Sequence, residues 1–192
     1  MAEQNGSFIG SYGVMYSDEA PNLAFLEVDS DQSRRFGQHY ALPEIATCSA
    51  VILSPDGKQV FFLHDSDRDE LVLPSIPWVD RSEYPNELLR KEMEQKTGTP
   101  MPEAKKVASN DERVPIDIMT IPLDVDPDTM ETTQVGLDLR YAFLAQTVLG
   151  NYDDGNVDKV EWIGITDTRI DEVLGRVGRK LGKLRFADVS LW

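Results

Sequence analysis

A strand, turn and strand pattern between Ala46 and Asp65 constrains the fold more than any other feature of this sequence. The apolar runs "ATCSAVILS" and "QVFFLHD" flank the turn sequence "PDGK". Pro55 presets the backbone for a turn, and Gly57 is free to adopt a positive φ. Two apolar runs joined in this way predict a β-hairpin.

A short strand and a helix are predicted next. The strand "ELVLP" spans residues 70–74 and ends at a proline, which cannot continue a hydrogen-bonded ladder. A helix is predicted from Glu83 to Thr97, with Ser82 as its cap and Pro85 in its first turn. Gly98 can close this helix in the left-handed conformation.

The second half of the chain repeats the alternation of strands and helices. Strands are predicted at "VPIDIMTIPL", "LDLRYAFLAQTV" and "KVEWIGI", and an amphipathic helix at "TDTRIDEVLGRVGRKL", capped by Thr166 or Asp167. This order predicts an α/β sandwich in which helices lie on either side of a mixed sheet. We expect an N-terminal arm over residues 1–45 and one domain over residues 46–192.

Charge and cysteine content narrow the classes of partner. The 192 residues carry a formal net charge of −15, which opposes binding to phosphate backbones and anionic membranes. Cys48 is the one cysteine, so an intrachain disulfide and a cysteine-based zinc site are both excluded. We expect a cytoplasmic protein with a small-molecule ligand and no nucleic acid or membrane partner; monomer and homodimer both stay open.

The segment "ELLRKEMEQKTG" resembles part of the Nudix box of diphosphate hydrolases. That box reads Gly, five residues, Glu, seven residues, then Arg-Glu-apolar-any-Glu-Glu-any-Gly-apolar. Counted back from Gly98, the spacing places Glu83 on the first Glu, Lys91 on the Arg and Glu92 on the next Glu. The segment "LHDSDRDELVLP" into "VDRSE" is also similar to fungal members of the family. The resemblance implies a Nudix-like fold over residues 46–184.

The sequence departs from this box at the positions that bind the metal ion in the family. Pro77 stands at the opening Gly, and Gln95 and Lys96 replace the paired acids. The family binds magnesium or manganese through carboxylate oxygens, and a lysine ammonium would repel such an ion by roughly several kcal/mol. Lys96 follows Glu92 by four residues, which favours an ion pair between them. We therefore predict no metal site and no cofactor.

One alternative would preserve a shifted metal site. Glu83, Glu87 and Glu94 are spaced by four and seven residues and would share one helix face. That site requires a rotated helix, which would remove Leu89 and Met93 from the core.

The candidate site combines acids and a histidine, predicted to be catalytic, with residues predicted to bind the substrate. Imidazole and carboxylate groups are suited to general acid–base catalysis, and an aromatic wall suits an apolar ligand. The predicted catalytic residues are Glu92, Glu83 and His64, and the predicted substrate-binding residues are Trp78, Ile76, Lys91 and Lys96. Asp80, Asp138 and His39 complete the pool of acid–base groups.

Three functions are compatible with this sequence. The first is a small-molecule enzyme that carries out metal-independent isomerisation, cyclisation or hydrolysis with Glu92. The second is a non-catalytic protein that binds a ligand or another protein. The third is a residual Nudix diphosphate hydrolase, which alone would need magnesium or manganese.

Overall fold

The computed structural model describes residues 46–65, 69–79, 82–101, 114–125, 132–153, 159–174 and 176–181. The predicted N-terminal arm lies outside these ranges. The elements are β1 (Ala46–Leu53), β2 (Gln59–Asp65), β3 (Glu70–Val72), β4 (Ser75–Pro77), α3 (Pro85–Thr97), β5 (Asp117–Val125), β6 (Thr132–Leu144), β7 (Lys159–Gly164), α4 (Thr168–Leu174) and α5 (Arg176–Leu181).

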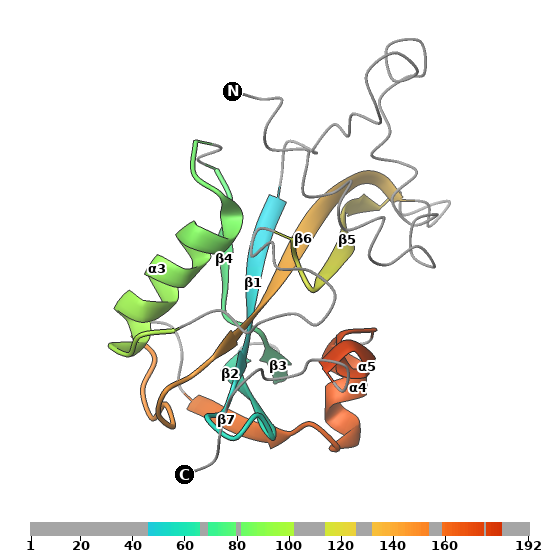
Figure 1. Ribbon diagram of the computed structural model, residues 1–192. Coiled ribbons are helices and arrows are strands. Elements are labelled where there is room, and N and C mark those ends of the chain that lie inside the picture. The colour runs from blue at the N-terminus through green and yellow to red at the C-terminus, as the bar shows by residue number, and fades with distance from the viewer. Residues whose placement is uncertain are drawn as a thin grey trace.

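A mixed seven-stranded sheet forms the centre of the fold (Figure 1). Strands β3, β2, β1, β6 and β5 follow one another in this order, while β4 pairs with β1 and β7 pairs with β2. β1 runs parallel to β6 along its whole length, from Ala46 opposite Leu137 to Leu53 opposite Leu144. Apart from Thr47, every residue of β1 is buried, as expected for a strand covered on both faces.

The predicted hairpin is present, and its turn is held by side chains. Gly57 has a φ of 68°, in the left-handed region that glycine tolerates. The Ser54 hydroxyl donates to Asp56 Oδ1 at 2.6 Å, and the backbone N–H of Lys58 donates to the same oxygen at 3.1 Å. The Ser54 hydroxyl, followed by the Lys58 N–H, lowers the pKa of Asp56 because both stabilise its carboxylate.

Two hydrophobic cores lie on opposite faces of the sheet. Figure 1 shows α3 on one side of the sheet and α4 and α5 on the other. Strand residues alternate between the faces, so neighbours in β2 such as Phe61 and Phe62 belong to different cores. The first, which we call the α3-side core, includes Cys48, Phe61, Ile76, Trp78, Leu89, Met93, Tyr141, Phe143 and Tyr152. The second, the α5-side core, includes Val51, Leu53, Phe62, Ala142, Ile163, Leu174, Val177 and Leu181.

Several element boundaries differ from the sequence prediction. Strand β4 was not predicted, and it forms because Ser75 to Pro77 pair with β1 before the helix begins. β5 begins at Asp117 and β6 at Thr132, so the first starts later and the second earlier than predicted. The predicted C-terminal helix is two short helices, α4 and α5.

The start of α4 confirms one of the two predicted caps. Asp167 Oδ1 accepts the backbone N–H of Arg169 at 3.0 Å, which satisfies a donor at the helix terminus. The Arg169 side chain, which also contacts Glu161, lowers the pKa of Asp167 through its hydrogen bond. No helix within the described ranges is long and apolar enough to cross a membrane.

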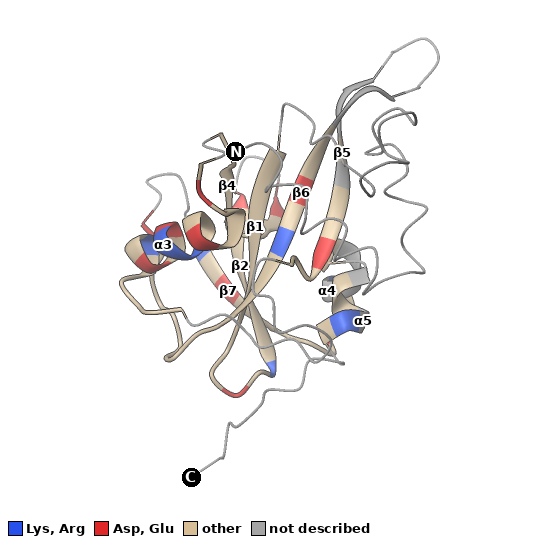
Figure 2. Ribbon diagram, turned by 45° about the horizontal axis from the view of Figure 1, so that its top comes forward, with Lys and Arg blue, Asp and Glu red and all other residues tan. Residues whose placement is uncertain are grey.

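Among the described residues, four charged side chains are buried, those of Asp117, Asp138, Arg140 and Lys180. Figure 2 shows charged positions of both signs on β5, β6 and α5. Arg140 Nε donates to Asp138 Oδ2 at 2.9 Å, and Lys180 Nζ donates to Asp117 Oδ1 at 2.8 Å. Asp117 and Arg140 are register partners on β5 and β6, so the two ion pairs lie side by side. The Ser49 hydroxyl extends this network to β1 by donating to Asp138 Oδ1 at 2.6 Å.

This network attaches the helices to the sheet. Arg140 Nη1 lies 3.5 Å from the carbonyl oxygens of Val173 and Leu174, at the end of α4, where a helix carries unpaired acceptors. Lys180 reaches Asp117 from α5. Helices of six and seven residues have little stability of their own, so their position depends on these contacts and on the α5-side core.

We expect the Asp117–Lys180 pair to be sensitive to loss of either partner. Lys180→Met removes the ammonium that neutralises a buried carboxylate, and should lower the free energy of unfolding by about 3–5 kcal/mol in urea titrations. Lys58→Met, which removes an exposed partner of Asp56, should change it by less than about 0.5 kcal/mol. Equal effects of the two substitutions would contradict a structural role for the buried pair.

Candidate functional site

The predicted site segment forms helix α3, but the helix begins two residues later than expected. Tyr84 is the N-cap, in extended conformation and without a side-chain cap hydrogen bond, and Pro85 occupies the first turn. The predictions of Ser82 as the cap and of Glu83 inside the helix are therefore wrong. Proline at this position suits a helix start because its missing N–H would have no partner there.

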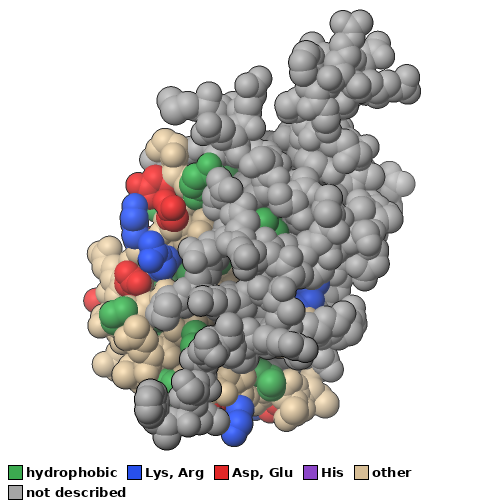
Figure 3. Space-filling model, in the orientation of Figure 1, with side chains coloured by type: hydrophobic (Ala, Val, Ile, Leu, Met, Phe, Trp, Pro, Cys, Tyr) green, Lys and Arg blue, Asp and Glu red, His purple; other side chains and the backbone are tan. Residues whose placement is uncertain are grey.

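Glu83 and Lys91 are brought together. Lys91 Nζ donates to Glu83 Oε2 at 2.7 Å, and the Lys91 and Glu83 side chains are 58% and 39% exposed. Exposed pairs of this kind contribute at most about 1 kcal/mol. The pair joins the segment before α3 to the outer face of the helix, where side chains of both charges gather (Figure 3).

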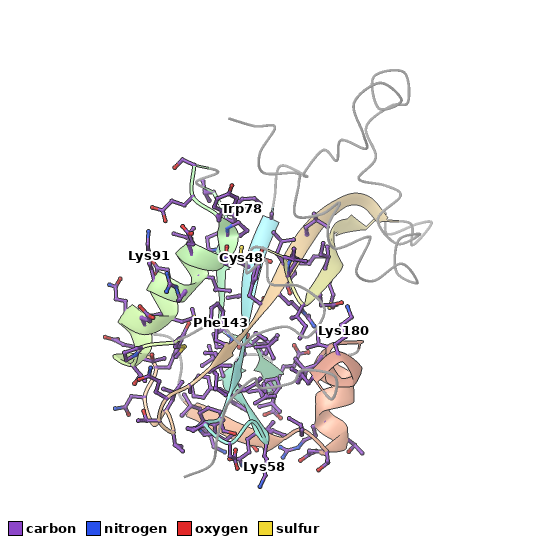
Figure 4. The ribbon with its side chains drawn as sticks, viewed as in Figure 1. Cys48, Lys58, Trp78, Lys91, Phe143 and Lys180 are labelled. Carbon is purple, nitrogen blue, oxygen red and sulfur yellow. The ribbon has the colours of Figure 1, made fainter. Side chains whose placement is uncertain are left out.

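Trp78 and Ile76 lie in the α3-side core. Trp78 is 1% exposed and Ile76 is 7% exposed. The Trp78 backbone N–H donates to the Ala46 carbonyl at 2.8 Å, and its indole Nε1 donates to the Glu83 carbonyl at 3.3 Å. Figure 4 shows Trp78 beside Cys48 of β1, whereas Lys91 points away from the sheet. Both residues, which were predicted to line the ligand site, are thus buried below the molecular surface.

Glu92 and Lys96 do not form the predicted ion pair within the described part of the chain. Glu92 is half-buried on α3, next to the buried Met93. The Lys96 ammonium instead lies 5.3 Å from the centroid of the Tyr152 ring. Helix spacing placed Glu92 and Lys96 within reach of each other, but it could not show that the lysine lies near the ring of a distant tyrosine.

The alternative of a rotated helix with a shifted acidic site is wrong. Leu89 and Met93 are fully buried, so the helix faces the core as its apolar spacing requires. Glu94 Oε1 accepts the backbone N–H of Met101 at 3.0 Å, and the Glu83 carboxylate contacts Lys91. These acids therefore have separate structural contacts and do not form one cluster.

His64 and Glu92 lie on opposite faces of the sheet. His64 is paired with Leu71, and both side chains point to the α5-side core, while α3 covers the other face. His64 Nε2 lies 3.1 Å from Asp69 Oδ1, and Asp69 has a φ of 55°. The structure thus separates the predicted histidine from the predicted acid.

Asp138, from the wider acid–base pool, is buried with Arg140 on the α5 side of the sheet. Asp80 and His39 lie outside the described residues. Across the ranges that the structure describes, no three His, Cys, Asp or Glu side chains converge in a way that could hold a metal ion.

Sequence reasoning missed two separate features. One is the contact between Tyr152 and Lys96, and the other is the set of buried charges on β5 and β6. Within the stretch "YDDGN", nothing local indicates that Tyr152 contacts a helix more than fifty residues earlier. The charges were visible as Asp138 and Arg140 within the apolar run "LDLRYAFL". Two charges at alternate positions of a buried strand indicate a buried ion pair.

Comparisons with known proteins define the fold. No protein-family model and no curated protein sequence matches this chain. The crystal structure of a Nudix-family hydrolase from Clostridium perfringens is similar, with a TM-score of 0.55 and 14% identity, over 75% of this chain and 100% of that chain. An Ap4A hydrolase from C. elegans, with a TM-score of 0.48 and 12% identity over 72% of this chain and 95% of that chain, is more distant.

The class of this protein follows from its architecture and the first of these similarities. It has a Nudix-like α/β fold with a mixed seven-stranded sheet, as the sequence predicted. At 14% identity the similarity shows the fold alone.

Gly98, the residue that ends α3 and matches the last Gly of the box, provides a test of how this helix end is stabilised. Its φ is 66°, and a Cβ atom added at this position would meet no other atom within 4 Å. Gly98→Ala should therefore destabilise through backbone strain alone, by about 1–2 kcal/mol in urea titrations. Gly150, which has equal space and no positive φ, is the matched control, and Gly150→Ala should cost clearly less. Equal costs would contradict this explanation.

Proposed function

We propose that this protein binds a small molecule on the α3 side of a Nudix-like fold and that Glu92 is the acid–base group of a metal-independent reaction. The reaction classes that one carboxylate can support here are isomerisation, cyclisation and hydrolysis. Divalent cation-dependent diphosphate hydrolysis, the activity implied by an intact box, is not part of this proposal.

The observation that carries the proposal is the placement of Lys96. An ammonium stands at a position where the box has a carboxylate, and it lies over Tyr152, one helical turn after Glu92. A positive charge carried one helical turn after Glu92, where the box has an acid, opposes a divalent cation at that carboxylate. The Glu83 carboxylate contacts Lys91, which reduces the negative charge available to a cation further.

Glu92 is the carboxylate of α3 that best fits an acid–base role. It is half-buried, whereas Glu87 is exposed and Glu94 accepts the Met101 amide. Lys91 and Lys96 can supply positive charge to an anionic substrate group near this helix. Because Trp78 and Ile76 are buried, we propose that they support the wall of the ligand site from behind and do not contact the ligand.

A second candidate function is binding without catalysis, and one observation favours it. His64, the predicted partner base, lies on the opposite face of the sheet from Glu92. A ligand-binding protein needs no such pair. Turnover by Glu92 alone distinguishes the two candidates, because a binding protein would hold the same ligand and release it unchanged.

A titration with divalent cations tests the loss of metal-dependent chemistry. A site with a dissociation constant of about 0.1 mM would add about 2.7 kcal/mol of stability at about 10 mM cation. That corresponds to a rise in melting temperature of roughly 5–10 °C for a chain of this size. We expect no such rise with Mg²⁺ or Mn²⁺ beyond that of NaCl at equal ionic strength. A specific rise would restore the diphosphate hydrolase as the leading function.

Substitution of Glu92 tests the catalytic part of the proposal. With a small molecule that a thermal-shift screen identifies as a substrate, Glu92→Gln should reduce turnover by about 10²–10⁴-fold, because the amide cannot exchange a proton. The melting temperature should stay close to that of the wild type. Glu87→Gln, an exposed change on the same helix, is the control and should retain activity. Retained turnover in Glu92→Gln would exclude Glu92 from the mechanism.

A further inference from the structure

The connection that follows β6 is fixed to three different elements. The Trp162 Nε1 of β7 donates to the Leu149 carbonyl at 2.9 Å. The Tyr152 ring lies 6.2 Å from the Phe61 ring of β2, measured between centroids. The Asp153 N–H donates to the Lys96 carbonyl at 2.9 Å, which reaches α3. We call residues 149–153 the anchored segment.

Lys96 contacts this segment twice. Its carbonyl accepts the Asp153 amide, and its ammonium lies 5.3 Å from the Tyr152 ring centroid, within the range of a cation–π interaction. Lys96 is also in the last turn of α3, where the helix dipole favours a positive charge. Tyr152 is 8% exposed, so its ring is held in place between the helix and the sheet.

We propose that Lys96 is a positioning residue that fixes the anchored segment against the C-terminal turn of α3. The lysine then has two consequences: it stands where the box has an acid, and its side chain adds one contact to those that hold a connection more than fifty residues later. This role goes beyond the proposed function, because it holds whether or not the α3 side carries a reaction.

The electrostatic surroundings of position 96 oppose a glutamate in place of the lysine. A carboxylate there would face the negative π surface of Tyr152 and the negative end of the α3 dipole. Both effects would repel the side chain from the anchored segment.

Amide hydrogen exchange, measured residue by residue by NMR, tests the role of Lys96. In Lys96→Met, which keeps the side-chain length but removes the charge, exchange at Tyr152 and Asp153 should accelerate by about two- to fivefold. Exchange at Leu89 and Met93 should stay unchanged, because the buried face of α3 is intact. Lys96→Arg should retain protection, and Lys96→Glu should lose more of it than Lys96→Met.

Lys91→Met is the matched control, since it removes an exposed ammonium from the same helix, one that pairs with Glu83. It should leave exchange at Tyr152 and Asp153 at the wild-type rate. Unchanged exchange in Lys96→Met would overturn the proposal, and so would an equal acceleration in α3 and the anchored segment, which would indicate general destabilisation. A Mg²⁺ response of the wild type would count against the proposed function and would leave this result intact.

Discussion

The parallel pairing of β1 with β6 organises both layers of helices around the sheet. It joins the N-terminal hairpin to the strand that follows β5, along the whole length of β1. Because both faces of this pair are buried, it fixes where each layer of helices can pack. α3 covers one face through Leu89 and Met93, and the helices α4 and α5 cover the other.

Buried charge and exposed charge have different consequences in this protein. The Asp138–Arg140 and Asp117–Lys180 pairs are enclosed on the α5 side, where losing one partner leaves a poorly solvated charge. On α3, Glu83 and Lys91 meet at the surface and contribute little to stability. Glu92 and Lys96 are half-buried and lie between these two extremes.

Local sequence patterns predicted most elements of the fold but fewer of the contacts at the site. The hairpin, the helix end at Gly98 and the cap at Asp167 follow from turn and capping preferences, which act over a few residues. Strand β4 was missed because three residues give no periodic signal, and they are ordered by pairing with β1. The prediction of a Glu92–Lys96 pair was wrong, and helix spacing alone could not show that Lys96 lies near the ring of Tyr152.

From the order of the amino acids it follows that Gln95 and Lys96 stand where the Nudix box has acids, and that one cysteine excludes a disulfide within the chain. These conclusions need only the identity and spacing of residues. The tertiary structure decided that His64 and Glu92 lie on opposite faces, that Trp78 is enclosed and that Lys96 contacts Tyr152. Each depends on strand register or on packing between distant segments, which local pattern does not encode.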